Sequence, residues 1–156
     1  MRSRPFLTCL FVLASGSAPA PAATTFTAGL TGTQAIPGTN SPARGTGTVI
    51  LNDNSDGITV SLSVFGLTGF TTSAGIYGPS SFSSIGPLQF PLFGAFGNTS
   101  LFISNAFFSI NPTQVSDLTA NRLLFVVNTT AFPGGEIAGT LGRFGTLGIP
   151  PGPRFE

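Results

Sequence analysis

The sequence predicts an all-β protein: an antiparallel β-sandwich or barrel of the immunoglobulin-like or Greek-key type, with one short helix near residues 112–119. Three observations support this prediction. Apolar and polar residues alternate strictly from 58 to 64, which is the period of a strand with one buried face. The other hydrophobic runs are short and are separated by Gly, Pro, Asn and Ser, which favours many strands joined by turns. A single helix-start signature begins at Asn111, so helix is a minor component.

The first half of the chain contains three predicted strands, at 24–31, 45–51 and 58–65. In the first strand Phe26, Ala28 and Leu30 share one face, and the other face carries mostly threonine. A loop is expected over 32–44. The second and third strands are separated by Asn, Asp, Ser and Gly at 52–57, which is typical of a hairpin turn.

The second half begins with a stretch from 80 to 110 that is rich in phenylalanine and broken by Gly and Pro, which predicts short strands and packed loops. Because the chain has no Trp and one Tyr, we expect most of these phenylalanines to fill the core. Asn111 as a cap, Pro112 at the first position and Gln114 at the third predict a helix that ends near 120–121. Two last strands are expected, at 123–127 and 136–141.

The two ends of the chain differ from the domain between them. Residues 1–22 combine arginines with a short apolar run and a small-residue cleavage pattern, which predicts a signal peptide and a mature start at Ala23. The β domain is expected over 23–142, followed by a Gly/Pro-rich tail over 143–156 that is predicted to be disordered. The prediction is therefore a protein that is secreted, periplasmic or held at the cell surface.

Charged residues are only 7% of the chain, compared with about 25% in ordinary globular proteins. Without residues 1–22, four arginines face five acidic residues, a net charge of −1 that predicts no binding of nucleic acid. No run after residue 22 is long and apolar enough to span a membrane. The low charge also leaves little repulsion between copies, so self-association is an open alternative.

Residues that usually carry catalysis or bind metals are scarce. The chain has no histidine and no lysine, and its one cysteine, Cys9, lies in the expected signal peptide, so no catalytic residue, metal or cofactor is predicted. The segment 52–57 imitates the start of a calcium loop, but its twelfth position is Ser63 rather than Glu, and a polar turn explains it more simply. Glu136 is the only acidic residue inside a predicted strand. It is expected to be held by backbone amides or by Arg122 or Arg143.

Three segments together resemble the CHRD domain, the module repeated in chordin and found in exported bacterial proteins. They are Phe26 to Pro37 with the pattern F-x-A-x-L-x-G-x-Q-x-x-P, the run Ala74 to Pro79 with the sequence AGIYGP, and the run Asn111 to Leu141, which contains NPTQVSDL and PGGEIAGTL. The order and spacing of these segments cover residues 24–142. The resemblance implies a β module, and the scarcity of catalytic side chains predicts that it is not an enzyme.

The departures from the family pattern occur at its most polar positions. Gly75, Tyr77 and Asn128 stand where the family usually has histidine, and Ala138 stands where it usually has arginine after Gly-Glu-Ile. Tyr77 and Asn128 are expected to form a buried structural pair, and with Gly75 and Glu136 they are the candidate site positions.

The function predicted from the sequence is a structural or interaction role, with a neutral Thr-rich face and loops presented to an unidentified protein, cell-envelope or matrix partner. Two alternatives stay open: a metal-binding or redox protein derived from a histidine-bearing relative, and a self-associating matrix component.

Overall fold

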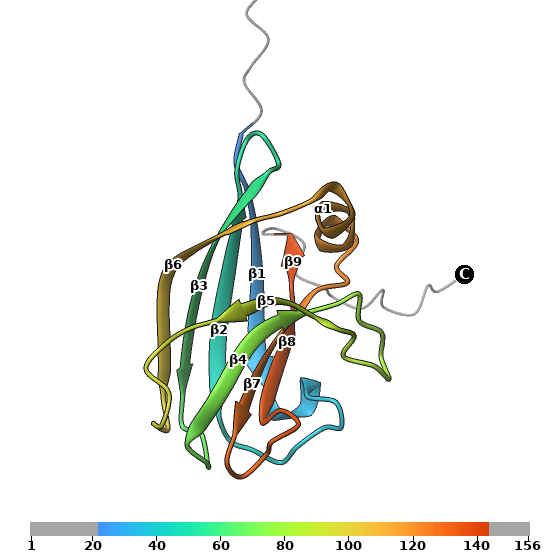
Figure 1. Cartoon of the computed structure of the whole chain (residues 1–156). Helices are drawn as coiled ribbons and strands as arrows, with labels where there is room; N and C mark the ends of the chain where they lie inside the picture. Colours follow the sequence, from blue (N-terminus) through green and yellow to red (C-terminus); the bar gives the residue numbers. More distant parts are fainter. Residues whose placement is uncertain (1–21, 144–156) are drawn as a thin grey trace, which may run out of the picture.

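Nine strands within residues 22–143, the part of the chain that the computed structural model describes, form one antiparallel sheet that curls into a nearly closed barrel (Figure 1). The order across the sheet is β5-β4-β7-β8-β1-β2-β3-β6, with β9 beside β1. The strands are β1 Thr24–Thr31, β2 Arg44–Leu51, β3 Gly57–Phe65, β4 Thr71–Tyr77, β5 Leu88–Leu92, β6 Leu101–Ser109, β7 Leu124–Thr129, β8 Ile137–Thr140 and β9 Gly142–Arg143. The helices are η1 Gly32–Gln34, a 3-10 turn, and α1 Pro112–Thr119. The predicted all-β class and the single short α-helix are confirmed.

The hairpin of β2 and β3 shows why the alternation in the sequence produces a sheet. Ile58, Val60, Leu62 and Val64 are all buried, as their period of two predicts. The turn between the strands is fixed by Asn52, whose Oδ1 accepts hydrogen bonds from the backbone N–H groups of Asp56 and Gly57, both at 3.1 Å. The segment is therefore the polar turn that its composition favours.

The barrel interior is packed from opposite walls. Phe125 on β7 has no exposed surface, and its ring lies against Gly47 on β2, where a Cβ atom would overlap the ring. Glycine at this position thus makes room for the largest side chain of the facing strand.

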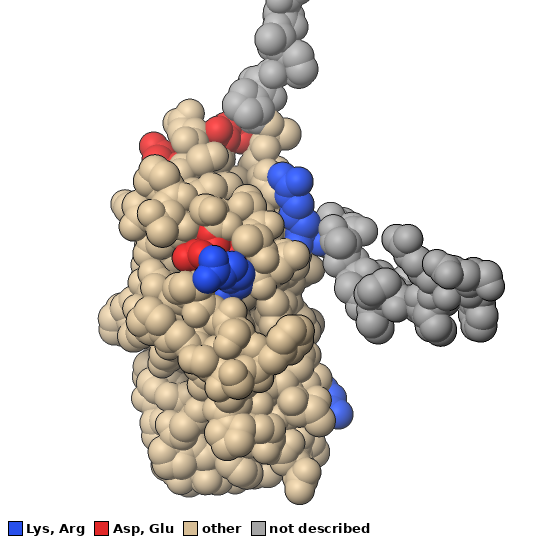
Figure 2. Space-filling model, turned by 90° about the vertical axis from the view of Figure 1, so that its right-hand side faces the viewer, with Lys and Arg blue, Asp and Glu red and all other residues tan. Residues whose placement is uncertain are grey.

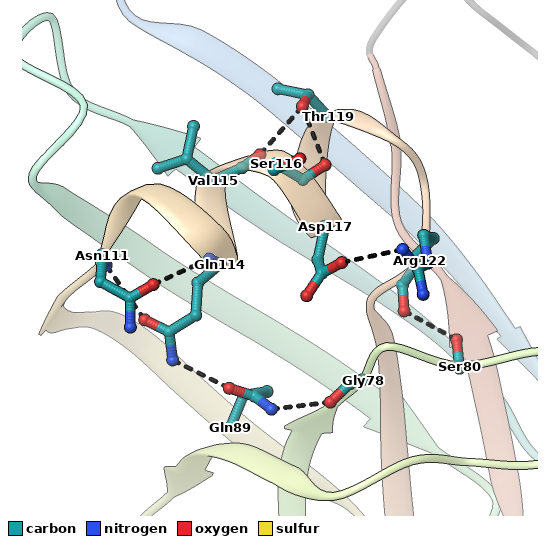
Figure 3. A network of polar contacts seen from close by, with 10 residues as sticks. All are labelled: Gly78, Ser80, Gln89, Asn111, Gln114, Val115, Ser116, Asp117, Thr119 and Arg122. Atoms are coloured by element: carbon teal, nitrogen blue, oxygen red, sulfur yellow. Dashed lines mark hydrogen bonds and ion pairs between the residues drawn. The ribbon is translucent and has the colours of Figure 1, made fainter.

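β5 and β6 are the edges of the sheet, and they are joined by side chains rather than by a strand ladder. Phe90 of β5 and Phe108 of β6 pack with ring centroids 5.6 Å apart. Gln114 of α1 donates a hydrogen bond from Nε2 to Gln89 Oε1 of β5 at 2.9 Å (Figure 3). The ring pair thus connects the two edges directly, and the glutamine pair connects β5 to α1, which follows β6.

Helix α1 begins with the predicted capping box. Gln114 N donates to Asn111 Oδ1 at 2.9 Å, and Asn111 N donates to Gln114 Oε1 at 3.0 Å (Figure 3). Leu118 is fully buried against the core, so the helix packs on the barrel. The helix ends at Thr119, and Asn121 follows with φ of +56°, which agrees with the predicted end near 120–121.

The middle of the chain differs from the sequence-based expectation in three respects. β6 is a nine-residue strand rather than a short one, and β4 was not predicted because Ser73, Ala74 and Gly75 give it almost no hydrophobic pattern. Phenylalanines of the 80–110 stretch do not mostly fill the core: Phe90 is buried, but Phe82, Phe93, Phe102 and Phe107 are exposed. Leucine, valine and isoleucine from other strands already occupy the inward positions.

Residues 1–21 and 144–156 lie outside the described part, so nearly all of the expected signal peptide and tail falls there, and both stay predictions. Among the described residues, no helix has the length and hydrophobicity needed to cross a membrane.

Candidate functional site

The three positions at which the resembled family usually has histidine share the outer face of β4 and β7. Gly75 and Tyr77 lie two residues apart on β4, and Asn128 lies on β7 opposite Ser73. Gly75 and Asn128 are thus diagonal neighbours in the ladder. The sheet brings these three positions together, as the resemblance implies.

Apolar atoms fill the space at this place. A Cβ atom at Gly75 would lie 2.5 Å from Leu88 Cδ1 and 3.2 Å from Tyr77 Cε2, so the space of a side chain at 75 is already occupied. Tyr77 packs on a small cluster of Ala35, Leu124, Val126 and Ala138, which includes the position of the family's arginine. At positions 75, 77 and 138, the polar residues of the family pattern are replaced by a hydrophobic contact.

Asn128 does not form the expected pair with Tyr77. Its Nδ2 donates a hydrogen bond to Ser73 Oγ at 3.1 Å. Its Oδ1 is buried and has no hydrogen-bond partner within residues 22–143. The Tyr77–Asn128 hydrogen bond was therefore a wrong expectation, because the ladder places Ser73 rather than Tyr77 opposite Asn128.

Glu136 directly precedes β8 and has no exposed surface. Its Oε1 accepts hydrogen bonds from Ser41 Oγ at 2.5 Å, Thr68 N at 2.7 Å and Thr68 Oγ1 at 2.8 Å. Its Oε2 accepts from Thr129 Oγ1 at 2.7 Å and Gly69 N at 3.3 Å. The expected backbone amides are confirmed, whereas hydroxyl groups take the place of the expected arginines. This carboxylate joins the loop after β1, the loop after β3 and the end of β7.

The surroundings of Glu136 set its charge state. Burial raises the pKa of the carboxyl group, but the hydrogen bonds from Ser41, Thr68 and Thr129 outweigh burial and hold the pKa below its usual value. Glu136 is thus a fixed anion with all of its strong acceptor directions used inside the protein. That arrangement is typical of a structural carboxylate rather than a general base, which needs a raised pKa and access to substrate.

The other acidic residues are dispersed. Asp53 and Asp56 lie in the exposed turn between β2 and β3, and Asp56 accepts a hydrogen bond from Asn52 Nδ2 at 2.6 Å. Asp117 is buried on α1 and forms an ion pair with Arg122 at 3.4 Å (Figure 3). No three residues among His, Cys, Asp and Glu come together to hold a metal within the described residues.

The feature that best fits a binding surface is the outer side of β1, β2, β3 and β6, which we call the hydroxyl face. The strand register aligns its side chains in rows. Thr27, Thr48 and Ser61 form one row, and Thr46, Ser63 and Phe102 form the next. The predicted Thr-rich face is confirmed by this register.

Exposed aromatic rings border the hydroxyl face along β3 and β6. Phe65 is 54% exposed, Phe102 is 57% exposed, and their rings meet edge to face with centroids 4.9 Å apart. Phe107 lies farther along β6 opposite Thr59 and is also exposed. A bulge near Asn105, which has φ of +52°, places Phe102 and Phe107 on the same side although five positions separate them.

A shallow groove of about 200 Å³ runs over the same face and is lined by Thr46, Thr48, Ser61, Ser63, Phe102 and Ser104. Arg44 lies on β2 opposite Phe65, and its Nη1 donates to the carbonyl oxygens of Pro42 and Ala43. The sequence favoured core packing over an exposed binding surface for the phenylalanines of 80–110, so this aromatic border was not predicted. The alternation of Leu101, Phe102 and Ile103 could have indicated that Phe102 faces outward.

Comparison with known proteins gives one result. A family model described as the CHRD domain matches residues 26–141. No curated protein and no solved structure matches the chain.

Proposed function

The chain belongs to the CHRD domain family, and from that premise we propose that it is an exported interaction module that binds a protein or matrix partner through the hydroxyl face. The family is a β module that is generally non-enzymatic. Export is supported by the arginines, apolar run and small residues of 1–22.

The observation that carries this proposal is the exposed Phe65–Phe102 pair beside the rows of hydroxyl groups. Each ring leaves more than half of its surface in water, and covering apolar surface yields about 25 cal/mol per Å². Neighbouring threonine and serine hydroxyls can both donate and accept hydrogen bonds, which suits a partner without matching charges. Exposed aromatic clusters of this kind mark interaction sites on soluble domains.

The test compares a double variant, Phe65→Ser/Phe102→Ser, with a matched control, Phe93→Ser. Phe93 is 76% exposed and lies after β5, outside the hydroxyl face. Each variant is produced as the full chain in the cells to which the protein is native, so that these cells process it. The exported fraction is then cross-linked, and the chain is recovered with its bound partners by affinity purification. We expect the wild type and the control to retain a common partner that the double variant loses. Equal recovery by all three chains would refute the role of this face.

Export is tested separately by the mass and the N-terminal sequence of the chain in the exported fraction. The expected first residue is Ala23, because Ala20-Pro21-Ala22 satisfies the small-x-small cleavage pattern. A chain that keeps Met1 and stays inside the cell would contradict this part of the proposal.

Self-association is a second candidate, favoured by the low content of charged residues together with the exposed rings of β3 and β6. Sedimentation of the wild type over a concentration series decides it. Association that disappears in the Phe65→Ser/Phe102→Ser chain identifies the partner as a second copy. A monomer at every concentration rules this candidate out.

A further inference from the structure

A second and roomier cavity lies away from the hydroxyl face, between two loops on the other side of the barrel. It has a volume of about 430 Å³ and is bordered by η1 and the residues after it, by the loop between β4 and β5, and by Asn121. The first two walls are drawn on the right of Figure 1, in cyan and yellow-green. A volume of several hundred Å³ is in the range of small-molecule sites. The residues that line it are shared with neither the hydroxyl face nor the Glu136 cluster.

The two loops are held in place by hydrogen bonds. Gln34 of η1 donates from Nε2 to the Gly29 carbonyl oxygen at 2.9 Å. On the opposite wall, Ser80 Oγ donates to the Arg122 carbonyl oxygen at 2.8 Å (Figure 3). The walls are therefore preformed, which lowers the entropic cost of binding a ligand.

The cleft combines an apolar floor with an aromatic ring at its mouth. Ala35 and Leu124 are buried and form part of the floor. Phe82 lies at the tip of a tight turn in which Ser81 and Ser84 exchange two backbone hydrogen bonds, at 2.9 and 3.2 Å. Its ring is fully exposed, so the fold itself gains nothing from a phenylalanine there.

The polar groups of the cleft are neutral. Asn121, Ser81 and Thr140 line it, and their side chains make no hydrogen bond within residues 22–143. Hydroxyl and amide groups supply both donors and acceptors. No charged side chain lines the cleft among the described residues, and most of this side of the molecule is uncharged (Figure 2). An ionic ligand would find no compensating charge here.

We propose that this cleft binds a neutral saccharide, with the apolar C–H face of a sugar ring against Phe82 and the sugar hydroxyls against Ser81, Asn121 and Thr140. A sugar ring has an apolar face and a rim of groups that donate and accept, which is the same division that the cleft presents. The proposal does not depend on the hydroxyl face, because the two surfaces are separate.

The test uses saturation-transfer NMR and calorimetry on the full chain as processed by the cell, with maltotriose, cellotriose, xylotriose and chitotriose as neutral probes. Trigalacturonate is the charged comparison. We expect at least one neutral probe to bind and the charged one to bind at least about tenfold more weakly, because the cleft has no cation to offset its carboxylates. Failure of all four neutral probes would overturn the proposal, and so would equal affinity for trigalacturonate.

Two variants place the binding in the cleft. Phe82→Ala is expected to weaken binding at least about tenfold, the scale of one aromatic contact, without changing the melting temperature. Asn121→Gly removes the amide and keeps a residue that accepts the φ of +56°. Phe93→Ala removes another exposed ring, one that does not line the cleft, and should bind like the wild type. Binding that survives Phe82→Ala and Asn121→Gly would show that the sugar binds somewhere else. The Phe65→Ser/Phe102→Ser chain should still bind the saccharide, because its substitutions lie on the hydroxyl face. Such binding would show that the cleft acts independently of the proposed function.

Discussion

Replacing Glu136 with glutamine perturbs the most heavily hydrogen-bonded side chain of the domain. Glutamine keeps one acceptor oxygen but converts the other into an NH₂ donor. The two donors now facing Oε2, Gly69 N and Thr129 Oγ1, then lose their acceptor. The three donors to Oε1 keep a partner, but that partner is no longer charged.

The free energy of unfolding should fall by about 3–5 kcal/mol, because hydrogen bonds to a charged group contribute about 1.5–3 kcal/mol each and a stranded buried donor costs about 1–3 kcal/mol. Glutamine also removes the penalty of burying a charge, which acts in the opposite direction. The pKa of Glu136 lies below its usual value, so the hydrogen bonds outweigh that penalty and the net effect is destabilising.

The lowered pKa also fixes the direction of the pH dependence. A carboxyl group whose folded pKa is below the unfolded value of 4.5 stabilises the fold fully above that pH. The contribution is lost as the pH falls through the folded pKa. The stability gap between the wild type and Glu136→Gln should thus be constant from neutral pH down to about 5 and should narrow in more acidic solution.

Urea unfolding at pH values from 7 down to 3 measures this gap. Asp53→Asn is the matched control, because it removes one negative charge from an exposed turn. The reasoning is refuted if Glu136→Gln differs from Asp53→Asn by less than about 1 kcal/mol at pH 7, the size of an ordinary hydrogen bond. A gap that stays constant through the acidic range would refute the pKa argument alone.

Three further outcomes follow from the structure. Gly47→Ala should destabilise by about 1–3 kcal/mol in thermal unfolding, because its Cβ would overlap the Phe125 ring, whereas Gly29→Ala on the neighbouring strand meets no atom and should be neutral. Asn111→Ala should cost about 1 kcal/mol through loss of the helix cap, and Asn111→Ser should restore most of it in the same assay. Elemental analysis of the purified chain should find no stoichiometric transition metal, because Gly75, Tyr77 and Asn128 supply no imidazole at the family's histidine positions; a stoichiometric metal would contradict that account.

The strands that could be predicted are those whose pattern is set by one buried face. β3 followed from alternation alone, because every second residue is large and apolar. β4 could not be predicted, because small residues on its outward face give it no hydrophobic pattern. Leu88 and Tyr77 cover Gly75, but the local sequence does not record a contact with another strand. Phe107 faces outward because of the bulge at Asn105, and a single extra residue leaves no mark in composition.

The environment of Glu136 was predicted only in part. That a lone acidic residue in a chain so poor in charge would be held by backbone amides followed from the cost of burying it. The hydroxyls of Ser41 and Thr68 could not be identified, because they lie 95 and 68 positions away and are two among many similar residues. Arg122, one of the two arginines expected beside Glu136, forms an ion pair with Asp117 instead.

β9 pairs with β1 through Phe26 and Arg143, so the first and last described strands are neighbours. Both ends of the domain therefore emerge at the same pole of the barrel, beside the turn between β2 and β3 (Figure 1). A domain with adjacent ends can be inserted into a host loop or linked in tandem without being pulled open. A partner domain attached there would cover that pole only. Because η1 lies at the opposite end of β1, the cleft beside it would stay accessible to a ligand.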